Sequence, residues 1–269
     1  IGGVITGDVS PACKKMIPQL TSLGVRSEIW LGEDDAMSSA RYLSAHPQQT
    51  ASALLQVAKR NPGLVGFNLD PEAEEVVTEQ DLDRFSQFLG QVTKTLNAAD
   101  PSIRFSVDVA CDTRQSHMTS NCSRLARSGI NRLMNMDTYI AGDFEAWGRS
   151  RLFPALDAVP LNVLGVGLGV WTDSRTVGTC APLRVPPSSL PRFNSTACCC
   201  AGNVKPESAK QRICLLMNRS VQELDLFILS QGVPNRTFPE PFWIPELQRF
   251  VAGGGCEITV PPAPVCPNA

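Results

Sequence analysis

Short apolar runs alternate with amphipathic stretches along the whole chain. Seven apolar runs are predicted as β-strands, namely Gly3–Thr6, Arg26–Leu31, Leu64–Leu69, Arg104–Val109, Arg132–Tyr139, Leu161–Leu168 and Glu223–Ile228. Apolar residues at three- and four-residue spacing predict helices between them, at residues 11–22, 48–60, 78–97, 120–128, 143–156, 207–219 and 243–251. This alternation is typical of a parallel β-sheet covered by helices.

Seven strand–helix units in a chain of 269 residues favour a single barrel. We expect an α/β fold of the (β/α)8 TIM-barrel type that lacks its first strand–helix unit or carries it in degenerate form, with loops tethered by disulfides. A doubly wound open sheet is the alternative. The barrel-like domain is predicted to cover residues 1–252, followed by a Cys- and Pro-containing C-terminal tail at residues 253–269.

Composition and charge exclude several other classes of protein. Hydrophobic residues make up 43% and charged residues 19% of the chain, which is a globular composition. The formal net charge of -2 at pH 7 gives no electrostatic reason to bind nucleic acid. No apolar run approaches the roughly 18 residues of a membrane-spanning helix, so we expect no membrane insertion.

The cysteines and glycosylation acceptors indicate a compartment. The chain has ten cysteines and two histidines but no Cys-x-x-Cys pair, so the sequence predicts disulfides, no metal site and no cofactor. Asn-x-Ser/Thr acceptors occur at Asn121, Asn194, Asn218 and Asn235. Disulfides and glycosylation together predict a secreted or extracellular protein, whose leader has been removed or lies upstream of Ile1.

Two disulfides are expected to close short loops, Cys111 with Cys122 and Cys256 with Cys266. Cys180 and Cys214 are expected to join the cluster of Cys198, Cys199 and Cys200, while the partner of Cys13 stays open. Spacing alone does not give the connectivity. Residues 172–206 would then form a cysteine-tethered loop over the carboxyl end of the barrel, where barrel enzymes build their sites.

Two acids follow one of the predicted strands. Alternation puts Gly66, Asn68, Asp70 and Glu72 on one face, and a polar face on a barrel strand needs a reason. Asp70 and Glu72 would project side by side, about 7 Å apart, at the carboxyl end of the strand. Mutual repulsion would raise the proton affinity of one of them, as general acid catalysis requires. The structural alternative makes Asp70 a helix N-cap, with Pro71 at the first helical position.

Residues 65–72 resemble the D-G-x-D-x-D-x-E strand of family 18 glycoside hydrolases, the chitinase-like (β/α)8 enzymes. Three positions match, namely Gly66, Asp70 and Glu72, and three are replaced, namely Val65, Asn68 and Pro71. The resemblance implies that Glu72 protonates the leaving glycosidic oxygen, while Asp70 orients a 2-acetamido group of the substrate that attacks the sugar carbon. Val65 and Asn68 stand where the family has the two aspartates of the charge relay behind Asp70.

Later strands carry further polar residues. Met136-Asp137-Thr138-Tyr139 is similar to strand six of that family, which implies that Tyr139 supports the acetamido group and Asp137 binds sugar hydroxyls. The other candidates for substrate binding are Asn68, Asp108, Trp171, Asp225 and Phe227. Asp108, Asp137 and Tyr139 could instead belong to a buried polar network or a loop cap, and Trp171 could instead be a core aromatic. The Asn-Leu-Asp-x-Glu and Met-Asp-Thr-Tyr strands resemble an uncharacterised group of secreted eukaryotic proteins more closely than true chitinases.

The sequence therefore predicts a secreted glycoside hydrolase-like protein that acts on glycans containing N-acetylhexosamine. Its partner would be a glycan or polysaccharide. The rival is a catalytically inactive barrel that binds carbohydrate or serves as a structural extracellular glycoprotein with assembly partners, because a fold alone does not confer an activity. Asp70 and Glu72 favour the enzyme, whereas the replacements in the motif favour the inactive barrel.

Overall fold

The structure, a computed structural model, describes residues 9–22, 24, 26–32, 36–71, 77–111, 118–136, 148, 152–169, 172–173, 206–227, 236–237 and 248–253. The chain divides into two compact units. The first unit comprises Ile1–Asp137 and Phe153–Gly165, and the second comprises Thr138–Leu152 and Val166–Ala269. A single barrel-like domain over residues 1–252 stays a prediction.

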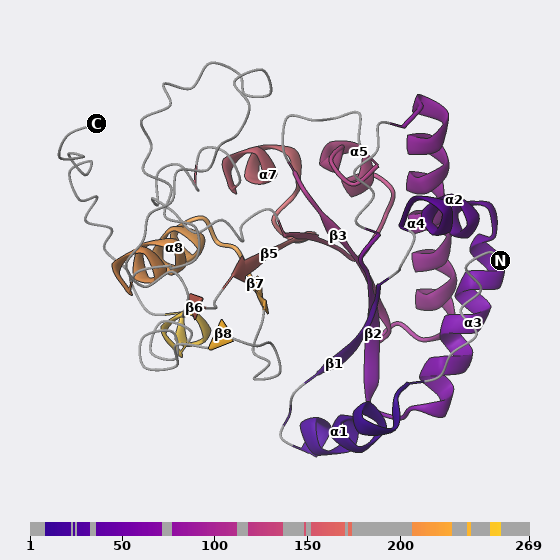
Figure 1. The fold of residues 1–269 in the computed structure, drawn as a ribbon, viewed down its shortest axis with the longest axis horizontal. Helices are drawn as coiled ribbons and strands as arrows, with labels where there is room; N and C mark the ends of the chain where they lie inside the picture. Colours follow the sequence, from indigo (N-terminus) through magenta and orange to yellow (C-terminus); the bar gives the residue numbers. More distant parts are fainter. Residues whose placement is uncertain are drawn as a thin grey trace. The chain divides into compact units, whose positions relative to one another are not determined.

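The first unit is built on a parallel sheet (Figure 1). Its strands are β1 (Ser27–Leu31), β2 (Leu64–Leu69), β3 (Arg104–Val109) and β4 (Arg132–Asn135), in that order across the sheet, followed by the first residues of β5 (Leu164–Gly169). The register pairs Trp30 with Asn68, Asn68 with Ser106, and Asp108 with Met134. Paired residues of neighbouring parallel strands point to the same side, so the register fixes which side chains share a face.

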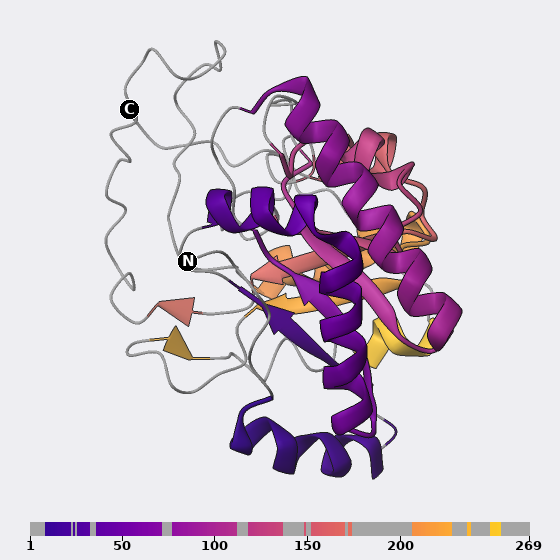
Figure 2. The same cartoon turned by 90° about the vertical axis from the view of Figure 1, so that its right-hand side faces the viewer.

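Helices cover one face of this sheet (Figures 1 and 2). Helix α3 (Pro47–Arg60) packs on β2, and helix α4 (Glu79–Ala99) packs on β3, on α3 and on α2 (Ala36–Ala45). Helix α1 (Pro11–Ser22) contacts β1, whereas α5 (Cys122–Ala126) contacts β4 and α7 (Phe153–Ala158). The face of the sheet under α3 and α4 is therefore the apolar one.

Helix α4 shows why these residues form these elements. The hydroxyl oxygen of Thr78 accepts the N–H of Asp81 at 3.2 Å, and the Asp81 carboxylate accepts the N–H of Thr78 at 3.2 Å, which is the predicted capping box. The buried face of the helix consists of Leu82, Phe85, Phe88, Leu89, Val92, Thr93 and Leu96. Phe88 meets Phe105 of β3 edge-on, with 6.3 Å between ring centroids. This core leaves the opposite face of the sheet for polar side chains.

The second unit contains the rest of β5, which neighbours β7 (Glu223–Phe227) in the sheet. Helix α8 (Pro206–Asn218) precedes β7, and β6 (Thr172–Asp173) pairs antiparallel with β8 (Arg236–Thr237). Arg212 of α8 is fully buried, and burial lowers the pKa of its guanidinium to about 10. The group still carries its charge at neutral pH, so the interior of this unit contains a cation.

Most of the predicted elements are confirmed. Strands β1, β2, β3 and β7 and helices α1, α3, α4 and α8 lie within two residues of the predicted bounds. The strand predicted to begin at Leu161 begins at Leu164, because residues 161–163 form a turn after Pro160. Strand β4 ends at Asn135, since Met136 is outside the strand. The strand predicted at Gly3–Thr6 lies outside the described residues.

Three further helices differ from the expected bounds. Helix α5 is shorter than the predicted 120–128. Helix α7 overlaps the predicted 143–156 at residues 153–156 and ends two residues beyond it. Residues 248–252 are helical within the predicted 243–251 and one residue beyond it. Helix α2 was not predicted, because its ten residues are rich in Ala and Ser and lack a strong apolar periodicity.

The predicted disulfide between Cys111 and Cys122 is confirmed, and it joins residues 11 apart in the sequence. Cys214 is also disulfide-bonded, and Cys13 has a free thiol. The remaining predicted disulfide cysteines, namely Cys180, Cys198, Cys199, Cys200, Cys256 and Cys266, lie outside the described residues. The same holds for most of the predicted loop at 172–206.

Candidate active site

The face of the first-unit sheet that points away from α3 and α4 carries polar side chains. They alternate with apolar residues along each strand, namely Glu28 and Trp30 on β1, Asn68 at the carboxyl end of β2 with Asp70 just beyond, Ser106 and Asp108 on β3, and Arg132 on β4. Asp70, Ser106 and Asp108 are buried. Buried polar groups are kept where they have partners, so the contacts of this face decide what it can do.

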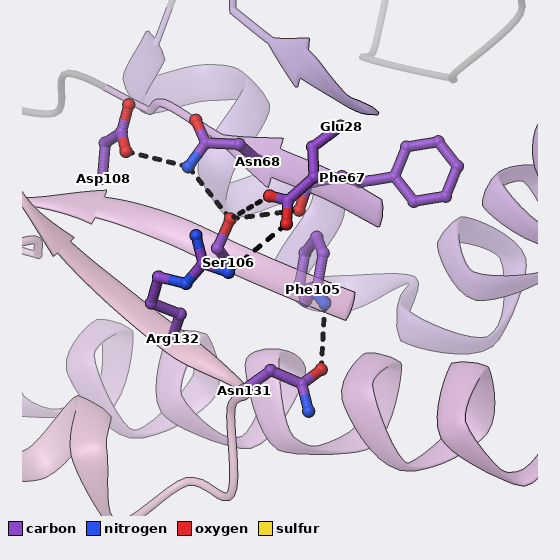
Figure 3. A network of polar contacts seen from close by, with 8 residues as sticks. All are labelled: Glu28, Phe67, Asn68, Phe105, Ser106, Asp108, Asn131 and Arg132. Carbon is purple, nitrogen blue, oxygen red and sulfur yellow. Dashed lines mark hydrogen bonds and ion pairs between the residues drawn. The ribbon is translucent and has the colours of Figure 1, made fainter. Parts of the chain in front are cut away.

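Asn68 links β2 to β3 (Figure 3). Its amide nitrogen donates to a carboxylate oxygen of Asp108 at 2.8 Å and to the hydroxyl oxygen of Ser106 at 3.1 Å. An amide nitrogen has two hydrogens, so these two bonds use both. Asn68 is therefore a fixed donor to its neighbouring strand.

The network continues to β1 and β4. The Ser106 hydroxyl lies 3.3 Å from Glu28 Oε2 and 3.3 Å from the carbonyl oxygen of Phe67, either of which can accept its hydrogen. The other carboxylate oxygen of Glu28 lies 3.4 Å from a guanidinium nitrogen of Arg132. Strands β1 and β4 are three strand spacings apart, about 14 Å in a flat sheet. This ion pair therefore reaches across β2 and β3 on the polar face (Figure 3), in a sheet that Figure 1 shows to be curved.

Asp70 lies just beyond β2, where the strand leaves the sheet. Its backbone N–H donates to the carbonyl oxygen of Leu31 at 3.0 Å, which ties it to the end of β1. Its carboxylate Oδ2 accepts the indole N–H of Trp30 at 3.1 Å. The side chain is only 7% exposed. Asp70 is thus a buried carboxylate held at the carboxyl end of the strands.

The glycine of the motif has a packing role. A Cβ added to Gly66 would lie 2.7 Å from the backbone carbonyl oxygen of Arg104 and 3.1 Å from Cγ of Glu28. A backbone oxygen cannot turn aside as a side chain can, so the close approach of β3 requires glycine at this position.

The structure brings together only some of the predicted site residues. Asn68, Asp70 and Asp108 lie on the polar face of the first unit, and Asn68 contacts Asp108. Glu72, Asp137, Tyr139 and Trp171 lie outside the described residues. Asp225 and Phe227 belong to β7 of the second unit, and their side chains are not described.

The capping alternative for Asp70 does not apply to helix α4. That helix is capped by Thr78, eight positions later, and Asp70 and Pro71 are outside any helix. Asp70 instead accepts a hydrogen bond from a side chain of the neighbouring strand. Asp70 is therefore not the cap of α4, and its role as a site residue stays a prediction.

Three residues of this face were missed from the sequence, namely Glu28, Trp30 and Arg132. The period-two pattern in Ser27–Leu31 would have placed Glu28 and Trp30 on one face. A salt bridge between β1 and β4 could not be foreseen, because it depends on the curvature of the sheet.

The described residues contain no group of three or more His, Cys, Asp or Glu side chains that could hold a metal ion. None of the described helices is long and apolar enough to cross a membrane.

Comparisons with known proteins identify the fold. No family model matches the chain, and no curated protein matches it. Solved structures do: a chitinase from Chromobacterium violaceum is similar with a TM-score of 0.63 at 15% identity, covering 93% of this chain and 89% of that chain. A chitinase from Rhizomucor miehei has a TM-score of 0.58 at 13% identity, covering 91% of this chain and 88% of that chain.

A third structure is a mutant family 18 chitinase from Cycas revoluta in complex with (GlcNAc)4, with a TM-score of 0.58 at 13% identity and 83% coverage of both chains. At such identities the likeness shows the fold and nothing finer. The chain therefore has the chitinase-like fold of family 18 glycoside hydrolases, a degenerate barrel of the TIM type, as the resemblance of residues 65–72 predicts.

Proposed function

We propose that this protein is a secreted glycoside hydrolase that acts on glycans containing N-acetylhexosamine. The observation that carries the proposal is the buried Asp70 carboxylate, placed just beyond β2 in a fold shared with chitinases. Barrel enzymes build their sites at this end of the strands. Glu72 follows two positions later in the matching motif.

In the proposed reaction Glu72 is the general acid. It protonates the glycosidic oxygen while the carbonyl oxygen of the substrate's own 2-acetamido group attacks the sugar carbon, so the leaving alcohol departs and a cyclic intermediate forms. Asp70 accepts the acetamido N–H and orients the group. Water then opens the intermediate, giving its proton to the Glu72 carboxylate, and the product retains the anomeric configuration.

The network beside Asp70 supports a preorganised site. Asn68 is fixed by its two bonds to β3, and Ser106 connects it to the ion pair of Glu28 and Arg132. Groups held by neighbouring hydrogen bonds lose little freedom when substrate binds. The proposed roles of Tyr139, Asp137, Trp171, Asp225 and Phe227 in substrate binding rest on the sequence resemblance alone.

Two matched variants test the catalytic assignment. Glu72→Gln removes the acid but keeps the volume, and Asp70→Asn removes the carboxylate but keeps an acceptor oxygen. We expect Glu72→Gln to lower kcat on chito-oligosaccharides at least 100-fold, since general acid catalysis contributes about that factor or more. Asp70→Asn should also lower kcat, because the acetamido group loses the carboxylate that orients it. Product anomers are followed by NMR, and circular dichroism checks folding. A Glu72→Gln variant that keeps most of the wild-type rate would exclude Glu72 as the acid.

One observation favours the rival function, a catalytically inactive carbohydrate-binding or structural glycoprotein. Asn68 donates both amide hydrogens to β3, so it cannot take up a proton as an aspartate in the relay would. Wild-type protein that binds chito-oligosaccharides without cleaving them would establish this rival. The next step would then be to identify the extracellular proteins with which it assembles.

Secretion is part of the proposal. It is supported by the disulfide between Cys111 and Cys122, by the disulfide-bonded Cys214, and by the four glycosylation acceptors in the sequence. Stable disulfides form in oxidising compartments and are rare in the cytosol.

A further inference from the structure

Trp30 is an exposed aromatic side chain beside a buried carboxylate. It belongs to β1, its side chain is 64% exposed, and its indole N–H donates to Asp70 Oδ2 at 3.1 Å. We propose that this indole is a docking platform for one pyranose ring of the glycan, held in place by Asp70. The inference rests on the proposed function, because it assigns the glycan a stacking position beside Asp70.

Two contacts fix the indole despite its exposure. The first is the hydrogen bond to Asp70, which anchors the five-membered ring. The second is its position over Gly32, where an added Cβ would overlap Cη2, Cζ2 and Cζ3 of the six-membered ring. The five-membered ring is thus hydrogen-bonded to a carboxylate, and the six-membered ring lies against Gly32, which leaves space for it because it has no side chain. An exposed tryptophan that only filled space would not need either contact.

A fixed and exposed indole suits a sugar. An aromatic face is apolar, and a pyranose ring with equatorial substituents presents C–H groups of matching shape on its faces. Aromatic side chains bury large areas at low entropic cost, and a side chain that is already held loses less freedom on binding. Because the indole N–H is bound to Asp70, the platform and the carboxylate keep a constant separation.

The hydrogen bond also makes Trp30 a positioning residue for Asp70. An N–H donor to a carboxylate stabilises the ionised form and fixes its orientation. In this chain that donor comes from β1, whereas Asn68 on the same strand as Asp70 directs its amide hydrogens to β3. A glycan stacked on the indole would therefore lie beside a carboxylate that is already oriented.

The experiment compares three variants of the full chain. Trp30→Ala removes the platform and the donor, Trp30→Phe keeps an aromatic face but removes the donor, and Gly32→Ala keeps the indole but places a methyl group where its ring lies. Met16→Ala is the matched control, since Met16 is also exposed, at 51%, and belongs to α1. Binding of tri-N-acetylchitotriose is measured by titration calorimetry.

We expect Trp30→Ala and Gly32→Ala to weaken binding about 10-fold, which corresponds to about 1.4 kcal/mol. Trp30→Phe should keep most of the affinity but lower kcat, because the hydrogen bond from the indole to Asp70 is lost. Met16→Ala should bind as wild type does. Binding by Trp30→Ala within twofold of wild type would overturn the platform, and Trp30→Phe with unchanged kcat would overturn the positioning role. Thermal melts exclude loss of folding, and Trp30→Phe provides the test should Gly32→Ala fail to fold.

The outcomes separate this inference from the proposed function. Wild-type protein that binds the trisaccharide through Trp30 but does not hydrolyse it would contradict the hydrolase and support the platform. Hydrolysis with a KM unchanged by Trp30→Ala would support the hydrolase and contradict the platform. Wild-type protein that neither binds nor hydrolyses the trisaccharide would contradict both.

Discussion

Asn68 shows how a single replacement changes the chemistry of a motif. The family has an aspartate at this position, and here an amide donates to the Asp108 carboxylate at 2.8 Å. An aspartate at 68 would place two acceptors against each other, so the amide and the carboxylate on β3 depend on one another.

Because Asn68 and Asp108 depend on one another, we expect that placing the aspartate of the family motif at position 68 lowers the stability of the protein. Asn68→Asp should lower the free energy of unfolding by about 3 kcal/mol at pH 7, because it removes the amide that donates to the buried Asp108 carboxylate and sets a second carboxylate beside it. Repulsion raises the proton affinity of the pair in the folded state, so the loss is present at neutral pH and shrinks as the pH falls below about 5. Urea unfolding at pH 7 and pH 4.5 measures both.

The exchanged pair is the control for that variant. Asn68→Asp combined with Asp108→Asn again pairs one amide with one carboxylate, and it should recover most of the lost stability. Surface changes without an effect usually shift the free energy of unfolding by less than about 0.5 kcal/mol. If the free energy of unfolding of Asn68→Asp alone stays within that limit of the wild-type value, the contact does not contribute to stability.

At this scale the sequence placed some site residues correctly and others not at all. Asn68 and Asp70 were predicted to share one face because strict alternation holds within β2, and it does. The sequence does not single out Trp30 as an exposed site residue, because exposure depends on neighbours that the sequence does not show. Asn135 pairs with Val109, on the opposite face from Asp108, and its side-chain oxygen accepts the N–H of Cys111 at 3.2 Å.

At the scale of elements, helix α4 depends on its first turn. Thr78→Ala removes the hydroxyl that caps the N–H of Asp81, and it should lower the free energy of unfolding by about 1 kcal/mol at pH 7. The side-chain hydrogen bond from Thr78 lowers the pKa of the Asp81 carboxyl below its usual value. Equilibrium unfolding in urea measures the loss.

The same contact has a defined pH dependence. Since the pKa of Asp81 is depressed in the folded state, its contribution to stability is present above the unfolded value of about 4 and is lost as the pH falls through the folded value. The difference between wild type and Thr78→Ala should therefore be larger at pH 7 than at pH 3. A difference that grows in acid would contradict the capping box.

The sequence predicts a helix or strand correctly where capping residues, apolar periodicity and residue propensity agree with the packing of the folded protein. Both the cap and the apolar periodicity point to α4, and the β-branched and aromatic runs point to β2 and β3. Strand β4 ends at Asn135, although the sequence pattern predicts a strand to Tyr139, and residues 137–139 of that prediction lie outside the described residues. Arg212 could not be predicted as buried, since charged residues are rarely enclosed and only tertiary packing covers it.

At the scale of the whole molecule, the barrel-type fold followed from the alternation of strands and helices together with the motif at residues 65–72. The comparison with chitinases confirms it at identities too low to transfer any activity. The division into two compact units could not be read from the sequence, because no composition shift or linker marks it.

The compartment is tested on the intact protein. The protein is expressed through a eukaryotic secretory pathway and digested without reduction. The digest should contain the peptide pair linked by Cys111 and Cys122, and most of the other cysteines should also be found in disulfides. Sugar should be found on at least two of Asn121, Asn194, Asn218 and Asn235. Recovery of ten free thiols, or of stoichiometric zinc, would contradict secretion.

The close packing at Gly66 bears on how relatives of this chain should be classified. Glycine is required there by the Arg104 carbonyl oxygen, so it will be retained in a working hydrolase and in a degenerate barrel alike. The presence of this glycine is therefore evidence for the fold and not for enzymatic activity. Sorting active from inactive descendants should therefore rest on Asp70 and Glu72 and on the pair at 68 and 108, whose chemistry the backbone does not dictate.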